Sequence, residues 1–574
     1  MILRQCLVLA AVLAGCSGPA TSSAGSGGAP PAIPENDAGN IPDATNDGVD
    51  GSTPKAPLPT GYFRISMWCG PPAAEMTKAR IDEIAADGFT TVTNACDPST
   101  NVPDYNSKML SLAEQDGLDA IVSDNRISAA LAGTNVASNL DDIVKDYATA
   151  KGLAGYFIGD EPSAPSFDGI ASVVAALKMR DPKHFAYTNL LPNYASAGQL
   201  GTSSYDDYVS QFLTKVKPDL FSFDYYPFLT SSDADSFFSD LEVVRTHAVA
   251  TGIPFFQFTQ AISFNAHRAT SQAEKLWMGI QTLAYGGAGI SYFTYWTPPG
   301  TQENFGQAII DSNGKETTQY AEVKAINARL TMFGRHLVAA RSTAVFHNGG
   351  LAPGVTPRVP GMPVYLPSLV PYTVGLFSVG SAGDVYVFLT NRDYANKQES
   401  DVYLASSTPE ELDGITGTFK PMATLGDGAN GTKVHVALAP ADATLIHLEA
   451  PIAKGAPGSE LYIGTVRSDA GSLDVVDANF GGAKLRGAGW DECPSGYPES
   501  GKSFQSNGFW LCPRSDLASH TFYVGNVVAD QAQVYEVKGG TAPAVGAFGW
   551  DTCPNGSKLL GHRFDSNGYW ICTL

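Results

Sequence analysis

The sequence predicts an α/β protein whose main domain is a (β/α)8 (TIM) barrel, followed by a β-sandwich and two small disulfide-bonded, β-rich repeats. Three observations carry this prediction. Eight short apolar runs alternate with amphipathic helical stretches within residues 61–337, alternating runs without helical periodicity occupy residues 342–451, and one cysteine-containing pattern occurs twice within residues 458–574. At 574 residues the chain is too long for a single small module.

The charge balance excludes a class of partners. The chain has 57 acidic and 36 basic residues and a formal net charge of −21, which would repel the phosphates of nucleic acids and anionic lipid surfaces. No nucleic acid is therefore expected as a partner. Hydrophobic residues make up 44 % of the chain and charged residues 16 %, a profile typical of a folded, loop-rich secreted protein rather than a disordered one.

Residues 1–15 are predicted to be a lipoprotein signal peptide. Their apolar run, from Cys6 to Leu13, is too short to span a bilayer as a mature helix. The segment Leu13-Ala14-Gly15-Cys16 resembles a bacterial lipobox, which implies cleavage before Cys16 and attachment of lipid to its sulfur; an ordinary signal peptide is the alternative. Residues 16–60, rich in Ser, Gly, Ala and Pro, are predicted to be a disordered tether. We expect a protein of the bacterial cell envelope, outside the cytoplasm, that contacts the membrane through this lipid anchor only.

Residues 61–337 contain the eight predicted strand–helix units. The predicted strands are Tyr62–Trp68, Thr90–Asn94, Asp119–Ser123, Gly155–Gly159, Phe185–Asn189, Leu220–Asp224, Pro254–Phe258 and Ile290–Tyr295. Several of the helical stretches end at a glycine suited to a left-handed C-cap, such as Gly88 and Gly252. Eight units over about 275 residues match the usual size of a (β/α)8 barrel. The alternative, a doubly wound sheet, would place a glycine-rich phosphate loop after the first strand, where this sequence has Cys69-Gly70-Pro71-Pro72.

Catalytic and binding residues of such barrels lie at the C-terminal ends of the strands. Those ends carry carboxylates, carboxamides and aromatic side chains here: Trp68, Asn94, Asp97, Asp124, Asp160, Glu161, Asn189, Asp224, Tyr225, Tyr226, Gln257, Gln260 and Trp296. No histidine is among them, which argues against a His-ligated metal site and against a Ser-His-Asp hydrolase. We expect no metal ion and no other cofactor. A barrel lyase or aldolase would need a strand-end lysine or a metal cluster.

Two carboxylic acids are predicted to be catalytic. Hydrolysis of a glycosidic bond needs one acid to protonate the leaving oxygen and usually a second carboxylate. Glu161 follows the apolar strand Gly155–Gly159, a setting that would desolvate it and raise its pKa, so it is the predicted general acid. Asp160 directly precedes Glu161. Because successive residues of a strand face opposite sides of the sheet, both side chains reach a substrate only if the strand has ended or bulged. Asp224, beyond alternating aromatic residues, is the predicted second carboxylate. A loop or second-layer hydrogen bond is the alternative role for each.

The remaining strand-end residues are predicted to bind the substrate. They are Asp160, Trp68, Asn94, Asp124, Asn189, Tyr225, Tyr226, Gln257, Gln260 and Trp296. Flat aromatic rings at the mouth of a barrel can pack against the C–H faces of sugars while the polar edges of the rings stay hydrated. The candidates for this role are Trp68, Tyr226 and Trp296. Core packing is the alternative for each ring.

Three segments resemble bacterial glycoside hydrolase barrels similar to family 42 β-galactosidases. They are Gly155-Tyr156-Phe157-Ile158-Gly159-Asp160-Glu161-Pro162, Ser222-Phe223-Asp224-Tyr225-Tyr226-Pro227, and Ala284–Ile290 with Tyr292–Trp296. The resemblance covers roughly residues 60–335. It implies a glycosidase with a carbohydrate substrate, and it places an acid/base motif, Asn-Glu-Pro in the wider group, on Asp160-Glu161-Pro162.

The seventh strand departs from this resemblance. Relatives in the wider group have a nucleophilic glutamate there, whereas this sequence reads Phe255-Phe256-Gln257-Phe258-Thr259-Gln260. Three interpretations stay open. Asp224 supplies the second carboxylate; or the substrate's own acetamido group is the nucleophile, with Asp160 orienting it; or the protein is a non-catalytic carbohydrate-binding surface lipoprotein. The separation of the carboxyl groups distinguishes retaining from inverting geometry.

Residues 342–451 are predicted to form an accessory β-sandwich, and residues 458–514 and 520–574 two repeat modules. The pattern around Cys493 and Cys512 returns sixty residues later around Cys553 and Cys572. Each unit is too small to rely on its core alone, so a disulfide within each is expected. Exposed tryptophans in these repeats would indicate glycan binding, and structural packing beside the disulfide is the alternative.

The cysteines divide into pairs. Cys6 leaves with the signal peptide and Cys16 takes the lipid, so six remain. We expect three pairs: Cys69–Cys96, Cys493–Cys512 and Cys553–Cys572. No odd thiol is left over, which favours an oxidising compartment.

Overall fold

The structure is a computed structural model of the chain. It describes residues 62–299, 303–349, 352, 355, 362–366, 370–380, 383–428, 431–449, 461–467, 470–476, 484–486, 493, 499–503, 508–513, 521–528, 531–547, 552–554, 557–563 and 569–573. The predicted signal peptide, the predicted lipid site Cys16 and the predicted tether lie outside the described residues. Among the residues described, no helix is both long enough and apolar enough to cross a membrane.

The first domain is the predicted (β/α)8 barrel, which the structure confirms. Its eight parallel strands follow the order β1-β8-β7-β6-β5-β4-β3-β2. They are β1 (Arg64–Met67), β2 (Thr91–Thr93), β3 (Asp119–Val122), β4 (Leu153–Asp160), β5 (Phe185–Leu190), β6 (Leu220–Asp224), β7 (Phe255–Gln260) and β8 (Gly289–Phe293). Because a helix follows each strand, the chain returns each time to the same end of the barrel. The C-terminal ends of all eight strands therefore meet at one mouth, where the catalytic residues of such barrels lie.

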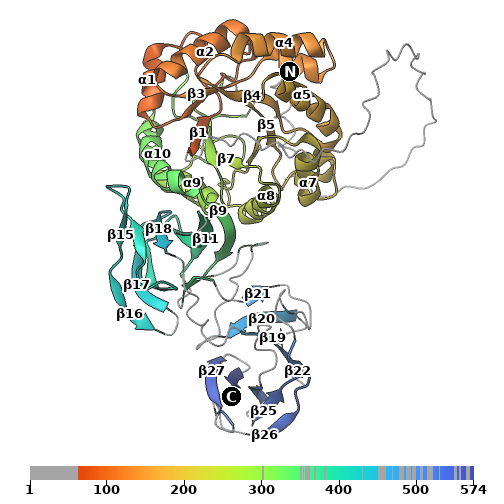
Figure 1. The fold of residues 1–574 in the computed structure, drawn as a ribbon, viewed down its shortest axis with the longest axis vertical. Coiled ribbons are helices and arrows are strands. Elements are labelled where there is room, and N and C mark those ends of the chain that lie inside the picture. Colours follow the sequence, from red (N-terminus) through yellow and green to blue (C-terminus); the bar gives the residue numbers. More distant parts are fainter. Residues whose placement is uncertain are drawn as a thin grey trace, which may run out of the picture. The chain divides into compact units, whose positions relative to one another are not determined.

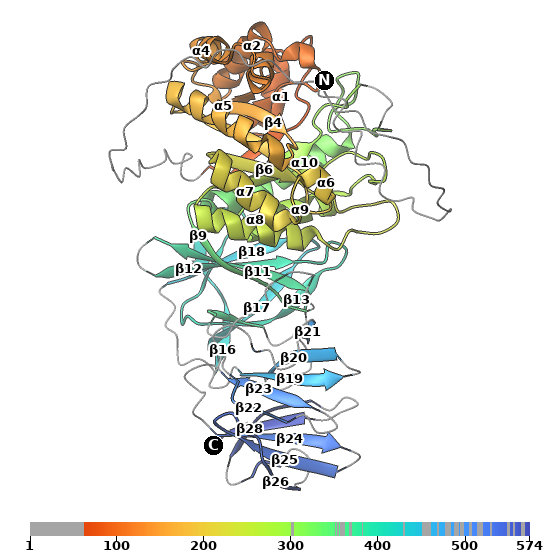
Figure 2. The ribbon, with the colours of Figure 1, turned by 90° about the vertical axis from the view of Figure 1, so that its right-hand side faces the viewer.

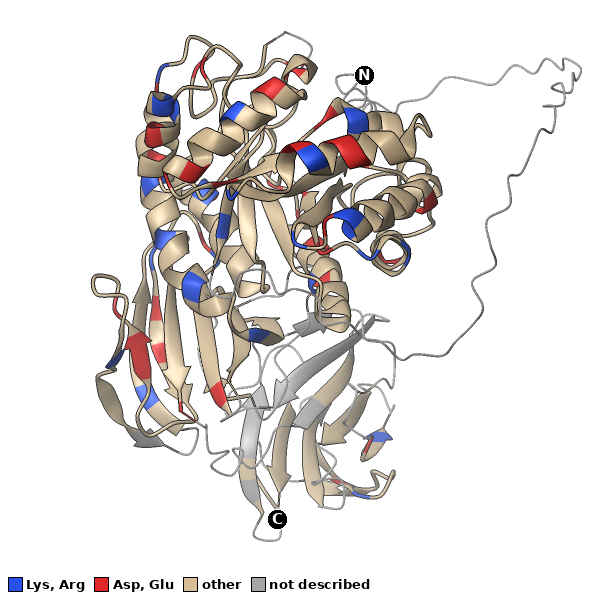
Figure 3. Cartoon of the chain, turned by 45° about the horizontal axis from the view of Figure 1, so that its top comes forward, with Lys and Arg blue, Asp and Glu red and all other residues tan. Residues whose placement is uncertain are grey.

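Helices surround the sheet (Figure 1). They are α1 (Lys78–Ala86), α2 (Pro103–Gln115), α3 (Asn125–Leu131), α4 (Val136–Tyr147), α5 (Phe167–Arg180), α6 (Ala197–Leu200), α7 (Tyr205–Val216), α8 (Phe237–Thr251), α9 (Gln272–Ala284) and α10 (Thr318–Leu337). Their ends follow local sequence signals. Ser271 and Glu274 form a capping box at the start of α9, and Gly252 ends α8 in the left-handed conformation, with φ of 67°. On the outside of this layer, residues of both charge signs are interspersed (Figure 3).

The barrel closes between β1 and β2 through side chains and loops rather than a regular ladder. Gly70 donates its backbone N–H to Asn94 O at 2.9 Å, and the predicted disulfide joins Cys69 to Cys96 with a Cα–Cα distance of 4.5 Å. A side chain at Gly70 would not fit, because its Cβ would lie 1.9 Å from the backbone oxygen of Thr93. The disulfide therefore ties the two ends of the sheet together at the seam.

Aromatic rings fill the interior of the barrel. Trp68, after β1, packs against Phe157 on β4 at 5.3 Å and against Phe258 on β7 at 5.6 Å between ring centroids. Tyr187 continues this layer, at 5.2 Å from Phe157 and 5.3 Å from Phe256. The two Trp68 contacts and the Tyr187–Phe256 contact join strands that are not neighbours in the sheet, so the rings lie inside the barrel. Edge-to-face and tilted pairs of this kind are favourable, and they form a floor beneath the strand ends.

The second domain is a β-sandwich of two antiparallel sheets, ordered β10-β13-β17-β16 and β15-β14-β18-β12-β11-β9. The strands are β9 (Arg341–His347), β10 (Val364–Tyr365), β11 (Tyr372–Val379), β12 (Asp384–Asn391), β13 (Gln398–Leu404), β14 (Glu410–Leu412), β15 (Phe419–Pro421), β16 (Thr424–Gly428), β17 (Gly431–Leu438) and β18 (Ala443–Leu448). Alternate residues of both sheets form a buried core. The sandwich lies beside α9 (Figure 2), where Trp277 Nε1 donates to Arg392 O at 2.9 Å.

The C-terminal repeats share one topology. Their sheets are ordered β21-β20-β19-β23-β22 and β26-β25-β24-β28-β27. The strands are β19 (Leu461–Arg467), β20 (Ala470–Val476), β21 (Lys484–Arg486), β22 (Gly501–Ser503), β23 (Phe509–Pro513), β24 (Phe522–Val528), β25 (Gln531–Val537), β26 (Ala544–Ala547), β27 (Lys558–Arg563) and β28 (Tyr569–Thr573). Each repeat contains its predicted disulfide, Cys493–Cys512 or Cys553–Cys572.

The described tryptophans of the repeats are packing residues. Trp510 and Trp570 are fully buried, so the expectation of exposed rings is wrong for both. Each ring lies across a glycine of the neighbouring strand: a Cβ on Gly464 would be 1.8 Å from the Trp510 ring, and one on Gly525 would be 2.0 Å from the Trp570 ring. The packing explains why tryptophan and glycine recur together. Trp490 and Trp550 lie outside the described residues.

Candidate active site

The end of β4 is irregular, and this brings Asp160 and Glu161 to the same place. The pairing of β4 with β5 shifts register between Phe157 and Gly159, and Glu161 adopts a left-handed backbone with φ of 45°. Its N–H still donates to Asn189 O at 2.9 Å. A left-handed non-glycine residue costs roughly 1–3 kcal/mol and is retained mainly at functional sites. The irregularity removes the alternation that would send one of the two side chains behind the sheet.

Asn189, on β5, holds two carboxylates of the site together. Its Nδ2 donates to Asp160 Oδ1 at 3.0 Å and to Asp224 Oδ1 at 3.3 Å, while its Oδ1 accepts a hydrogen bond from Ser222 Oγ at 2.8 Å. Glu161 is in turn hydrogen-bonded to Asp224. Both predicted catalytic residues therefore meet in one cluster, the carboxyl trio of Asp160, Glu161 and Asp224, at the ends of β4 and β6.

Burial raises the pKa of every member of the carboxyl trio. The pKa of Asp160 rises to about 6 and that of Asp224 to about 7, in the second case also through the charge of Asp160. The pKa of Glu161 rises well above its usual value through burial and then through the charges of Asp224 and Asp160. Each keeps part of its surface accessible. The hydrogen bond between Glu161 and Asp224 raises the pKa of Glu161 and lowers that of Asp224, so Glu161 is the member that keeps its proton longer as pH rises, as a general acid requires.

Tyrosines border the carboxyl trio. Tyr226 packs against Phe264 and Phe293 at 5.3 and 5.2 Å between ring centroids. Burial, followed by the charge of Asp224, raises the pKa of its hydroxyl, which places that hydroxyl near the trio. The same two causes raise the pKa of the Tyr194 hydroxyl, and this residue is 38 % exposed. Tyr194 lies four residues beyond β5, so the pattern of strand-end residues does not predict it.

Two predicted binding residues are used for internal contacts between β2, β3 and the outer helices. Asn94 Nδ2 donates to Asn106 Oδ1 at 2.7 Å, and Asn94 Oδ1 accepts the N–H of Ser123 at 2.9 Å. Asp124 caps α3 by accepting the N–H of Arg126 at 2.8 Å, and its other oxygen accepts a hydrogen bond from Tyr147 at 2.7 Å. The structure does not bring either side chain to the carboxyl trio.

Three more predicted binding residues also turn away from the trio. Gln257 accepts a hydrogen bond from Thr282 of α9 at 2.5 Å, so it lies behind β7. Gln260 is fully buried and donates to the backbone oxygens of Phe228 and Arg268, which fastens the loops after β6 and β7. The Tyr225 hydroxyl lies 2.5 Å from Ser236 Oγ.

The predicted aromatic platforms Trp68 and Trp296 differ in their exposure. Trp68 is partly exposed in the floor of the barrel mouth, whereas Trp296 is buried with the Arg80 guanidinium 5.3 Å above its ring, so protein occupies that face. At the level of Asp224, β7 carries Phe258, which is buried against Trp68. The structure thus gathers Trp68, Asp160, Glu161, Asn189, Asp224 and Tyr226 at one mouth. In the described part of the chain no three His, Cys, Asp or Glu side chains are placed to hold a metal ion.

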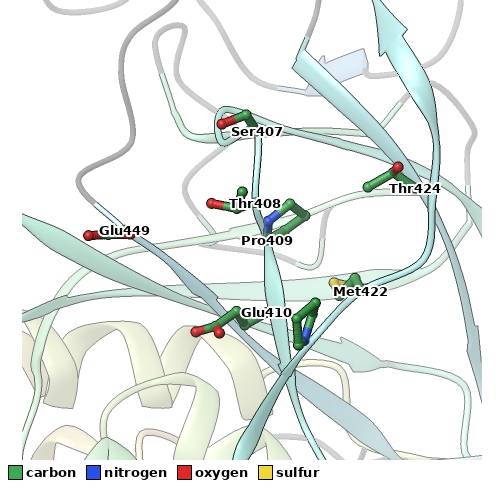
Figure 4. Close-up of a pocket in the computed structure, with 8 residues that line it drawn as sticks. Ser407, Thr408, Pro409, Glu410, Met422, Thr424 and Glu449 are labelled. Atoms are coloured by element: carbon green, nitrogen blue, oxygen red, sulfur yellow. The ribbon is translucent and has the colours of Figure 1, made fainter.

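A second hollow lies in the β-sandwich, with a volume of about 410 Å³ (Figure 4). Ser407, Thr408, Pro409, Glu410, Pro421, Met422, Thr424 and Glu449 line it. Glu410 within it is already paired with His447 at 3.2 Å. No residue of this lining is a predicted site residue, and the barrel mouth remains the candidate active site.

Solved structures that are similar to the chain include several β-galactosidases. The solved β-galactosidase from Marinomonas ef1 is 10 % identical with a TM-score of 0.36, covering 47 % of this chain and 60 % of that one. The one from Rahnella sp. R3 is 12 % identical with a TM-score of 0.41, covering 50 % and 58 %. The one from Bacillus circulans sp. alkalophilus is 9 % identical with a TM-score of 0.48, covering 68 % and 99 %. The chain thus spans about 60 % of the length of the first two.

No curated protein sequence matches the chain. The model of glycoside hydrolase family 42, described as β-galactosidase, matches residues 171–333. This segment extends from α5 to α10 and includes Asp224, whereas Glu161 precedes it. Residues 171–333 therefore carry the sequence pattern of a family 42 glycoside hydrolase barrel, as the resemblance implied.

Proposed function

We propose that this protein is a glycoside hydrolase that cleaves O-glycosidic bonds of an oligosaccharide or polysaccharide, with Glu161 as the general acid. One observation carries the proposal: Glu161, whose pKa is raised by burial and by two neighbouring carboxylates, is hydrogen-bonded to Asp224 at the mouth of a barrel whose residues 171–333 match the family 42 model. An ion pair does not account for a buried acid whose neighbours are two further carboxylates, and no three His, Cys, Asp or Glu side chains of the described residues are placed to hold a metal ion.

The geometry supports a definite first step. Glu161 gives its proton to the glycosidic oxygen while the bond between that oxygen and the anomeric carbon breaks. The anomeric carbon gains positive charge, which the carboxylates of Asp160 and Asp224 stabilise at short range. Trp68 and Tyr226 offer aromatic surface to the C–H faces of the sugar.

Non-catalytic carbohydrate binding is a second candidate, and the position of Phe258 favours it. An aromatic ring stands on β7 at the level of Asp224, where a second catalytic carboxylate would be needed. In that case the protein would bind glycans at the barrel mouth without turnover.

The release of reducing sugar from a panel of polysaccharides and aryl glycosides tests the proposal. We expect activity in the wild-type protein and a loss of about 10²- to 10⁴-fold in Glu161→Gln, because the leaving group then has no proton donor. Glu316→Gln, an exposed glutamate before α10, is the matched control and should retain activity. Glycan binding without turnover by the wild-type protein would favour the second candidate instead.

We also propose a lipid-anchored location in the bacterial cell envelope, on the extracytoplasmic side. The lipobox-like segment ending at Cys16 supports it, and three disulfides suit an oxidising compartment. Radiolabelled palmitate should enter the full-length protein during expression and be absent from Cys16→Ser. Equal labelling of both would contradict the anchor.

A further inference from the structure

The carboxyl trio lacks a member on the far side of the substrate. Glycosidases that use two carboxyl groups hold them about 5–5.5 Å apart for retention and about 6.5–9.5 Å apart for inversion, with the anomeric carbon between them. Glu161 and Asp224 are instead hydrogen-bonded to each other, and Asp160 and Asp224 share the Nδ2 of Asn189. All three come from β4 and β6, so they approach a substrate from one side. A carboxylate facing Glu161 must come from elsewhere.

The loop after β8 supplies such a group in Glu303. Three strands separate β8 from β4 in the sheet order, so the two lie on opposite sides of the barrel. The backbone oxygen of Glu303 accepts the N–H of Asn265 at 2.8 Å, and the N–H of Gly306 donates to Ser263 O at 2.8 Å. These two hydrogen bonds fasten the Glu303 segment to the loop that follows β7.

Aromatic packing joins the Glu303 segment to the border of the candidate active site. Phe305 lies 6.4 Å from both Phe264 and Phe293 between ring centroids. Those two rings are the ones that pack against Tyr226, whose hydroxyl is near Asp224. Phe305, two residues after Glu303, therefore packs into the group of aromatic rings that borders the carboxyl trio.

The carboxyl group of Glu303 is half-buried and has no hydrogen bond or ion pair with the described residues. Burial raises its pKa, which strengthens it as a base once it is ionised. Its charge also reaches Glu161: after burial and the charges of Asp224 and Asp160, Glu303 adds to the rise in the pKa of Glu161. An unpaired, partly desolvated carboxylate thus acts across the barrel mouth on the predicted acid.

We propose that Glu303 is the second catalytic carboxylate, the general base that activates a water molecule on the face of the sugar opposite Glu161. This inference rests on the proposed glycosidase function and deepens it, because it makes the reaction an inverting hydrolysis. The water oxygen forms a bond to the anomeric carbon and passes one proton to Glu303. The bond to the leaving oxygen breaks, and that oxygen takes the proton of Glu161. Exchange with solvent then returns both carboxyl groups to their starting states.

The test uses the full-length protein and a substrate that the wild-type protein cleaves. We expect Glu303→Gln to lower kcat by about 10²- to 10⁴-fold with a smaller change in KM, because the lost group acts on water rather than on the bound sugar. Azide, which needs no base, should restore turnover of Glu303→Gln and give a glycosyl azide of inverted configuration. Gln307→Ala, an exposed change in the same loop, is the matched control and should behave as wild type.

Two further measurements separate the failure of this inference from that of the proposed function. Proton NMR of the first product from the wild-type protein should show inversion; retention would overturn the role of Glu303 and favour Asp224 or a substrate acetamido group as nucleophile. Wild-type rates in Glu303→Gln together with an inactive Glu161→Gln would overturn the inference and leave the glycosidase in place. Absence of turnover in the wild-type protein would overturn both.

Discussion

Asn189 donates a hydrogen bond to Asp224 Oδ1 at 3.3 Å, and the same nitrogen donates to Asp160 Oδ1 at 3.0 Å. One neutral donor therefore holds two carboxylates that would otherwise repel each other. Both hydrogen bonds favour the charged form of the carboxyl group and counteract the effect of burial on its pKa.

Replacement of this donor should raise the pKa of both aspartates. We expect Asn189→Ala to lower kcat/KM by about 10- to 100-fold, the range seen when a hydrogen-bond partner that orients a metal ligand is removed, because the two aspartates lose a comparable orienting donor. The acidic limb of the pH–rate profile should move to higher pH, because Asp160 and Asp224 would then keep their protons longer as pH rises. An unchanged acidic limb would contradict this role for Asn189.

The carboxyl trio should also make stability depend on pH. The pKa of Asp224 is about 7 in the folded protein against a usual value of 3.8, so between these values the folded state binds more protons than the unfolded state. The free energy of unfolding therefore falls as pH rises through this window, and the stabilising effect of the bound proton is lost above pH 7. Asp224→Asn cannot ionise, so we expect its Tm relative to wild type to be higher at pH 8 than at pH 5.

Calorimetry or circular dichroism at the two pH values measures this difference. Asp235→Asn, an exposed aspartate in the loop that follows β6, is the control and should show the same Tm difference at both pH values. A Tm difference for Asp224→Asn that stays flat or falls between pH 5 and pH 8 would show that Asp224 ionises in the folded protein as it does in the unfolded chain.

The Cys69–Cys96 disulfide should stabilise the barrel at its seam. It closes a loop with a sequence separation of 27, for which chain entropy alone gives about 3–4 kcal/mol. We expect the double variant Cys69→Ser, Cys96→Ser to lose about that much free energy of unfolding. It should also raise KM, since Trp68 in the floor of the mouth precedes Cys69.

Thermal unfolding of the barrel and steady-state kinetics check this prediction. The double variant Cys493→Ser, Cys512→Ser removes a disulfide of the first C-terminal repeat and should leave the barrel transition and KM unchanged. Equal effects of the two double variants on KM would indicate a general loss of stability rather than a local one at the seam.

Sequence patterns were sufficient where the deciding signal is local. The alternation of strands and helices, the glycine after α8 and the paired cysteines each depend on residues close together in the chain, and the structure has all of them. Glu161 and Asp224 were found as strand-end acids for the same reason. The same local signal does not show which face a strand-end residue presents. Gln257 and Gln260 both lie on β7, and only their partners Thr282 and Phe228 show that they turn away from the carboxyl trio.

By itself the sequence determined the (β/α)8 architecture, the β-rich domains behind it and the acids at the ends of β4 and β6, since apolar periodicity and strand ends are local properties. Only the tertiary structure decided which groups meet. The register shift in β4 turns Asp160 and Glu161 to one site, and the pairing of β6 with β7 sets Phe258 beside Asp224. Contacts between distant segments also bring the loop of Glu303 against the wall around Tyr226. Such contacts join residues far apart in the chain, and no local pattern records them.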